Sequence, residues 1–139
     1  MSAVLRAGAV SLLAVSLVAC GGGDGNGDKD AIEDMVRKFF QAFEDGDSAA
    51  LAALFGQDCG DMTEAASSAI EQYEDFGDIE VNLDGVRIQN LNDSSAEFLP
   101  EGTITSDDEE TPLSSPDEQY SVAVKENGVW KIAECDLFL

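Results

Sequence analysis

The hydrophobic pattern of this 139-residue chain changes its period near the middle, and this change limits the folds open to it. From residue 30 to residue 73, apolar side chains recur every three or four positions, as on one face of a helix. From Ile79 onward they alternate with polar residues, as on a strand with one buried face. Helices followed by strands predict an α+β domain, with the helices packed on one face of a curved antiparallel sheet.

Three helices are expected in the first half of the chain. The first begins at Asp30, which is a natural N-cap, and stops at Gly46. The second is shorter and is capped by Asp47 or Ser48, and the third begins around Asp61. Each carries an apolar stripe, so all three need a surface on which to pack.

About four strands are expected in the second half. The first strand changes phase by one position at residues 84 and 85, which predicts a β-bulge. The second contains Pro100 and Gly102, which an edge strand tolerates. The last two strands are joined by Asn127 and Gly128, the most favourable pair for a two-residue hairpin turn.

The N-terminal residues have the layout of a signal peptide. After the positive charge of Arg6, the apolar run from Ala7 to Ala19 is shorter than the roughly 20 residues that a membrane-spanning helix needs. The run ends in Leu17-Val18-Ala19-Cys20, which resembles the bacterial lipobox. The resemblance implies diacylglyceryl transfer to the Cys20 sulfur, cleavage before that residue, and anchoring at the extracytoplasmic face of the cell membrane. An ordinary signal peptide with an incidental Cys20 is the alternative.

Cleavage after residue 19 would leave residues 20–29 as a glycine-rich tether and residues 30–139 as one domain. The chain has 7 Lys and Arg against 29 Asp and Glu, a formal net charge of −22. This field excludes nucleic acid as a partner, because phosphate backbones are bound by clustered basic side chains. The negative charge could favour solubility in a salty medium, attract cations or fit a basic partner, and a solvated acidic surface without a dedicated partner is the simplest interpretation.

Two acidic segments are candidate cation sites, and the second could also meet a basic partner. The segment from Asp24 to Asp30 resembles the opening of a calcium loop, but Lys29 stands where that loop needs Gly and Met35 stands where it needs a bidentate Glu. The segment from Asp107 to Glu110 is more simply an exposed loop, because four adjacent carboxylates repel one another. We therefore expect neither a metal site nor a cofactor.

If Cys20 carries lipid, Cys59 and Cys135 remain as an even pair in a compartment that oxidises thiols. A disulfide between them would close a loop of about 77 residues, worth roughly 4 kcal/mol in the chain-entropy model. A reactive thiol is the alternative, but the chain has no histidine to activate one. Strand alternation places Cys135 on the face opposite Trp130 and Ile132, so the bridge requires a bulge if that strand continues.

Two segments together carry a resemblance to a known superfamily. The run from Asp30 to Phe55 has an aromatic first helix, Phe39-Phe40-Gln41-Ala42-Phe43, and the closing strand reads Gly128-Val129-Trp130-Lys131-Ile132. Both resemble the nuclear-transport-factor-2-like superfamily, whose cone-shaped α+β fold is shared with polyketide cyclases and ketosteroid isomerases. Small exported actinobacterial lipoproteins of unassigned function are similar, including a cysteine after the second helix and another in the last strand.

The resemblance implies a cone that could hold a ligand, but this fold carries enzymes, ligand carriers and assembly modules alike. The expected function is a non-enzymatic module that binds a small apolar ligand in the cone, or an envelope protein through the sheet. Tyr73, Tyr120 and Trp130 are the candidate ligand contacts, although periodicity also assigns all three to the core.

The alternative is a hydrolase or isomerase in the same cone. Related enzymes place a histidine or an aspartate with a tyrosine donor inside it, and this chain has no histidine. A carboxylate would have to take that place, with its pKa raised by burial. The candidates, which lie beside core positions, are Asp75, Glu97 and Glu134.

Overall fold

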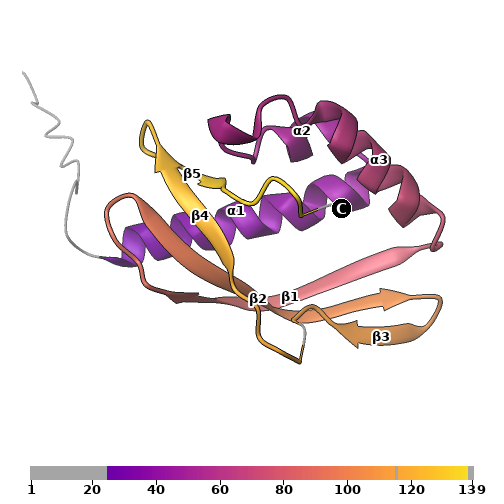
Figure 1. The fold of residues 1–139 in the computed structure, drawn as a ribbon. Coiled ribbons are helices and arrows are strands. Elements are labelled where there is room, and N and C mark those ends of the chain that lie inside the picture. The colour runs from indigo at the N-terminus through magenta and orange to yellow at the C-terminus, as the bar shows by residue number, and fades with distance from the viewer. Residues whose placement is uncertain (1–24, 115, 138–139) are drawn as a thin grey trace, which may run out of the picture.

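The computed structural model describes residues 25–114 and 116–137, so Cys20 and the predicted signal peptide of residues 1–19 lie outside the described residues. Within the described part, the helices come first and a curled antiparallel sheet follows (Figure 1). The helices are α1 (Gly25–Asp45), α2 (Ser48–Ala52) and α3 (Thr63–Glu74), with a short 3₁₀ turn, η1 (Gln57–Cys59), before α3. The strands are β1 (Ile79–Gln89), β2 (Ser95–Ser106), β3 (Glu109–Pro112), β4 (Ser121–Glu126) and β5 (Val129–Ile132). The α+β prediction is confirmed.

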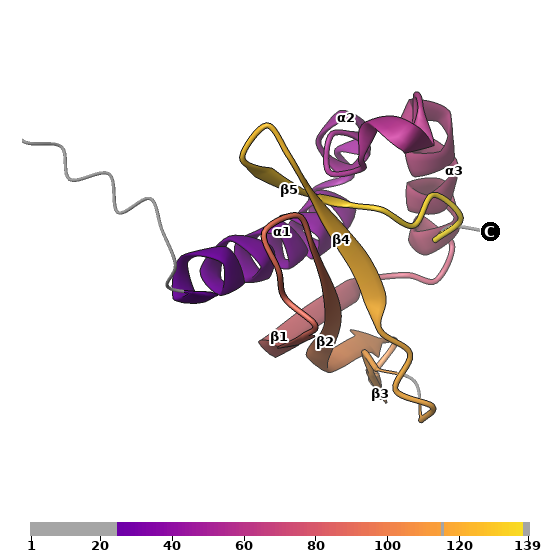
Figure 2. The same cartoon turned by 60° about the vertical axis from the view of Figure 1, so that its left-hand side comes forward.

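The sheet runs in the order β1-β2-β4-β5, and the short β3 pairs with the far end of β2. Figure 2 shows α1 lying across the concave side of this curled sheet, with α2 and α3 beyond it. The predicted bulge is present, since the β1–β2 register shifts between Leu83 and Gly85. A bulge increases the local twist, so it helps to curl the sheet into a cone.

Helix α1 begins at Gly25, more than one turn before the cap predicted at Asp30. The extra turn is held by Asp28, whose carboxylate accepts hydrogen bonds from Lys125 Nζ at 2.8 Å and from Trp130 Nε1 at 3.0 Å. Both partners belong to the β4–β5 hairpin. A tertiary contact therefore extends the helix into a glycine-containing stretch of low helix propensity. Residues 25–29, predicted as tether and weighed as part of a calcium loop, are helical.

The two shorter helices begin at or next to the residues that the sequence predicted. Asp47 is the N-cap of α2, and its Oδ1 accepts from Ala50 N at 3.0 Å. At α3, Asp61 Oδ1 accepts from Thr63 N at 3.0 Å, although Met62 occupies the N-cap position. Both aspartates thus satisfy an amide that has no partner within the helix.

Strand β2 was predicted to lie at an edge of the sheet, and this was wrong. It pairs with β1 along one side and, on the other, with β4 through Ser95–Phe98 and with β3 through Thr103–Ser106. Pro100 falls in the interval between these two partners. A residue without an N–H is tolerated there because no strand faces that side of β2.

The hairpin turns use residues that accept positive φ. Asn127 and Gly128 have φ of 50° and 78°, as a type I′ turn requires. Asp107 and Asp108 have φ of 49° and 69° and form the β2–β3 turn, so half of the predicted acidic loop is a tight turn. The other half belongs to β3, which the sequence did not predict because glutamate has low strand propensity.

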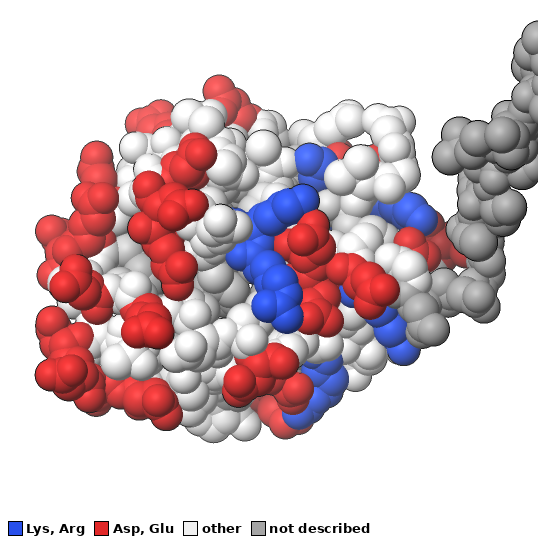
Figure 3. All heavy atoms as spheres, turned by 180° about the vertical axis from the view of Figure 1, so that it is seen from behind, with Lys and Arg blue, Asp and Glu red and all other residues white. Residues whose placement is uncertain are grey.

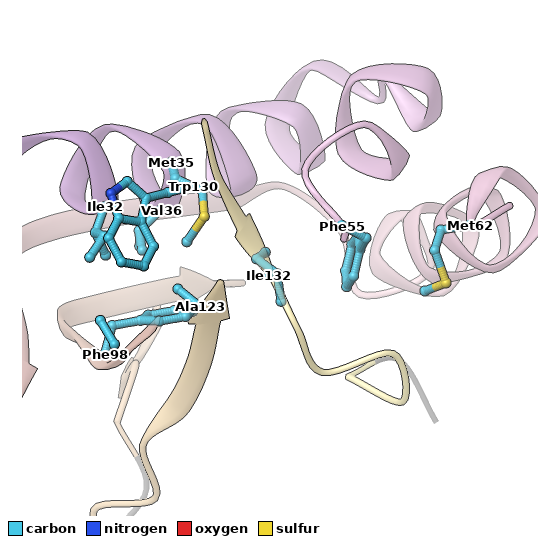
Figure 4. Close-up of a cluster of buried hydrophobic side chains, with 10 residues drawn as sticks. Ile32, Met35, Val36, Phe55, Met62, Phe98, Ala123, Trp130 and Ile132 are labelled. Carbon is cyan, nitrogen blue, oxygen red and sulfur yellow. The ribbon is translucent and has the colours of Figure 1, made fainter. Parts of the chain in front are cut away.

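The main core lies between α1 and the concave face of the sheet (Figure 4). Its buried members are Ile32, Met35, Val36, Phe55, Met62, Ala96, Phe98, Ala123, Trp130 and Ile132. A smaller cluster joins α1, α2 and α3. The outer edge of β5 is closed by the segment after α2, because Ile132 N donates to Leu54 O at 2.8 Å and Gly56 N donates to Ile132 O at 2.9 Å.

Candidate functional site

A cavity of about 1000 Å³ lies between the helices and the curled sheet. One wall comes from the second half of α1 and from α3, another from β2 and the segment that leads into β4, and a third from residues after β5. A volume of this size is at the upper end for small-molecule sites in proteins. The cone is therefore hollow in the region beyond its core.

Aromatic rings form much of the helical wall. Phe39 makes edge-to-face contacts with Phe40 and Phe43, with ring centroids 5.3 and 5.1 Å apart. Phe43 in turn contacts Tyr73 of α3, with centroids 4.6 Å apart. Burial raises the pKa of Tyr73 further above neutrality, and its hydroxyl is protonated at neutral pH. This wall presents a continuous aromatic surface with one hydroxyl.

The opposite wall carries Tyr120, which lies just before β4. The Arg87 guanidinium donates hydrogen bonds to Tyr120 and to the carboxylates of Glu118 and Glu101, and these contacts raise the pKa of Arg87. Arg87 projects from β1 and is largely exposed. Its charge is thus compensated by two carboxylates at the outer side of the wall.

Two of the three predicted ligand contacts line the cavity, and the third does not. Tyr73 and Tyr120 both line the cavity. Trp130 does not: the residue is 4% exposed and packs in the core beneath α1, with its indole N–H donated to Asp28. The core interpretation of Trp130 is the correct one, and the ring lies away from the cavity.

One of the three candidate carboxylates reaches the cavity. Glu134 lines it and is half-buried, whereas Asp75 is exposed at the C-cap of α3. Glu97 accepts hydrogen bonds from Gln89 and Asn90, outside the cavity wall. No charged or polar side chain is buried anywhere in residues 25–114 and 116–137 whose burial is described. The cavity therefore has one carboxylate, and that carboxylate is in contact with water.

The predicted disulfide between Cys59 and Cys135 is confirmed, with the two Cα atoms 5.1 Å apart. Strand alternation does not oppose the bond, because β5 ends at Ile132 and Cys135 lies in a turn beyond the strand. The bond ties the segment after β5 to η1. Since Glu134 and Leu137 both line the cavity, the disulfide also holds part of its wall.

Some wall residues were not predicted as functional. The phenylalanines of α1 were expected only as a core-facing stripe, and their rings continue past the core into the cavity. Leu113, Gln119 and Leu137 come from irregular segments where periodicity carries no information. The polar wall residues are Gln72, Ser114, Gln119, Ser121 and Glu134.

Two negative findings apply to the part of the chain that the structure describes. It contains no group of three or more His, Cys, Asp or Glu side chains that could hold a metal ion. None of its helices has the length and apolar character needed to cross a bilayer.

Neither a protein-family model nor a curated protein matches the chain, but solved structures do. A protein of unknown function from Mycobacterium tuberculosis is 15% identical, with a TM-score of 0.62 over 80% of this chain and 72% of that one. A candidate dehydratase of the NTF2-like family from Streptomyces avermitilis is 15% identical, with a TM-score of 0.53 over 77% and 91%. An uncharacterised protein with a cystatin-like fold from Caulobacter vibrioides is 18% identical, with a TM-score of 0.51 over 79% and 85%.

Identities this low show the fold alone. The domain has the cone-shaped NTF2-like, or cystatin-like, fold, as the resemblance of its first helix and closing strand predicted. The resemblance to exported lipoproteins is not tested by these matches and stays a prediction.

Proposed function

We propose that this protein is a lipid-anchored, extracytoplasmic binding module that holds a small apolar ligand in its cone without converting it. The observation that carries the proposal is the open cavity of about 1000 Å³ with its aromatic helical wall. An open cavity lined by apolar and aromatic side chains together with polar groups is a common form of small-molecule site. It favours a ligand over the other expectation, an envelope protein bound through the sheet.

The exposure and hydrogen bonding of the polar side chains in the cavity favour binding over catalysis. A general acid or base is most effective when its pKa lies near the working pH, which favours a histidine or a buried carboxylate. Glu134 is half-buried, and Tyr120 is already bonded to Arg87. A hydrolase or isomerase remains the second candidate, because Tyr73, Tyr120 and Glu134 share one cavity and a structural neighbour is a candidate dehydratase.

Lipid on Cys20 would attach the domain to the membrane through the start of α1. Helix α1 begins at Gly25, so the chain between anchor and helix spans at most about 18 Å. Phe43, in the cavity wall, lies about 27 Å further along the helix at about 1.5 Å per residue. The start of α1 would thus stay near the bilayer, and the cavity would lie at the other half of the same helix.

A neutral apolar fluorophore such as phenylnaphthylamine tests the proposal. The purified protein should bind it, and Ala69→Phe should weaken binding at least about tenfold, because this buried alanine of α3 lines the cavity and a phenyl ring would occupy its volume. Ala31→Phe is the matched control, since Ala31 is exposed on α1. The proposal fails if wild-type protein does not bind the probe, or if both variants bind it equally well.

The same purified protein tests the enzymatic alternative. Turnover of a dehydratable or hydrolysable substrate that disappears in Glu134→Gln, and not in Glu97→Gln, would replace the binding module by an enzyme. Both glutamates are half-buried, but only Glu134 lines the cavity.

A further inference from the structure

The charge of the cavity wall is of one sign. Among the described residues that line it, Glu134 is charged and no Lys or Arg is present. Six aromatic side chains share the wall: Phe39, Phe40, Phe43, Tyr73, Phe98 and Tyr120. The negative face of an aromatic ring attracts cations, and a desolvated ring does so more strongly than an exposed one. Carboxylate and rings together therefore favour a positively charged group inside the cavity.

Apart from Lys29, which is exposed in the first turns of α1 and does not line the cavity, the basic side chains of the described residues are engaged elsewhere. On α1, Arg37 pairs with Glu33 and Lys38 with Asp34. In the sheet, Lys125 pairs with Asp28, Lys131 donates to a backbone carbonyl, and Arg87 is held by two glutamates. Arg87 touches the wall through Tyr120, but its charge is already balanced there. An anionic ligand would find no uncompensated cation on this wall.

The surface around the cavity end of the molecule is also negatively charged. Seen from behind in Figure 3, Lys and Arg gather toward the N-terminal side, while the half over α3 and the β2–β3 hairpin shows Asp and Glu without them. Neither α3 nor the span from Ser95 to Pro112 contains a basic residue. Exposed carboxylates there include Glu71, Glu74, Asp75, Asp78, Asp107, Asp108, Glu109 and Glu110. A field of this kind raises the local concentration of cations.

We propose that the ligand of this cavity is an amphipathic organic cation, with an apolar body against the phenylalanines of α1 and an ammonium group that pairs with Glu134 and the aromatic faces. The inference rests on the binding function proposed above and specifies its ligand. It excludes fatty acids and other apolar anions as preferred ligands, although the cavity is large enough to hold them.

Three ten-carbon ligands with different headgroups test the proposal: decyltrimethylammonium, decanol and decanoate. Each is titrated as a competitor of the neutral fluorophore on the full purified protein, below its micelle concentration. Decyltrimethylammonium should bind about tenfold more tightly than decanol, and decanoate should bind most weakly. Raising ionic strength from roughly 0.05 M to 0.5 M should reduce the preference for the cation, because screening weakens exposed charges.

Substitution of the carboxylate identifies the partner of the headgroup. Glu134→Gln should reduce the ratio of cation affinity to decanol affinity severalfold. Glu97→Gln removes an equally half-buried carboxylate outside the wall and should leave the ratio as in the wild type. An unchanged ratio in Glu134→Gln would overturn the assignment of Glu134. The salt dependence of the wild type needs no variant. It therefore shows whether the preference for the cation is electrostatic even if Glu134→Gln fails to fold.

The outcomes also separate this inference from the function on which it rests. Equal affinity for decanol and decyltrimethylammonium, or tighter binding of decanoate, overturns the cation proposal and leaves an apolar binding module. Absence of binding by all three ligands and by the fluorophore overturns both.

Discussion

Breaking the bond between Cys59 and Cys135 should lower the free energy of unfolding by about 3 to 4 kcal/mol. The two residues are separated by 76 positions, and a closed loop of that length corresponds to about 4 kcal/mol of chain entropy in the unfolded state. Neither cysteine lies in a long element: Cys59 ends a three-residue 3₁₀ turn, and Cys135 lies beyond the end of β5. Cys59 contacts the core only at its margin, and neither cysteine belongs to α1 or the sheet, so the reduced protein should still fold, with less stability.

Urea denaturation of three samples provides the measurement: oxidised wild type, wild type with a reductant, and a Cys59→Ser, Cys135→Ser double variant. For an m value of about 1.5 to 2 kcal/mol/M, the expected loss moves the midpoint by about 2 M. Reduced wild type and the double variant should agree, because both lack the same cross-link. A midpoint that moves by less than about 0.5 M, or two free thiols counted before reduction, would refute the reasoning.

The same samples should differ in ligand binding. Glu134 and Leu137 flank Cys135 and line the cavity, so loss of the cross-link frees part of the wall. Affinity for a neutral apolar probe should therefore fall severalfold in the absence of urea, where the protein remains folded. Unchanged affinity in the reduced protein would mean that the wall is held by packing alone.

Three further perturbations have defined outcomes. Gly102→Ala should lower the free energy of unfolding by about 3 kcal/mol or more in a urea titration, because Gly102 has φ of +146° and a Cβ there would lie 2.0 Å from Asn82 O. In the control Gly85→Ala, at the same bulge, the new Cβ meets nothing within 4 Å, and the free energy of unfolding should change by less than about 1 kcal/mol. Equal urea midpoints for the two variants would contradict this. Hydrogen bonds from a lysine and a tryptophan lower the pKa of Asp28 from 3.8, so its contribution is present above that pH and is lost as the pH falls through the lowered pKa. The difference in Tm between wild type and Asp28→Asn should thus be full at pH 7 and shrink in acid, and a constant difference would argue against the contact. Cys20→Ala should release the protein into the medium or leave an uncleaved precursor, and membrane retention of a normally sized mature protein would disprove the lipid anchor.

The sequence by itself determined the class of the fold and much of its local structure. The change of period separated helices from strands, and the phase change at residues 84 and 85 located the bulge. Asp47 and the Asn127-Gly128 pair identified a helix cap and a hairpin turn. These features depend on neighbours within a few positions, so a single chain reveals them. Cysteine parity supplied the one long-range contact that was predicted correctly.

The tertiary structure decided the features that depend on residues far apart in the chain. Helix α1 starts early because Asp28 meets a hairpin about a hundred positions away. Pro100 is tolerated in an interior strand because the partners of β2 change at that point. Periodicity assigned Tyr73 and Trp130 equally to the core, yet one lines the cavity and the other does not. A pattern of apolar residues indicates which side chains leave water, but whether they meet one another or surround a hollow depends on how the sheet curls and where its loops return.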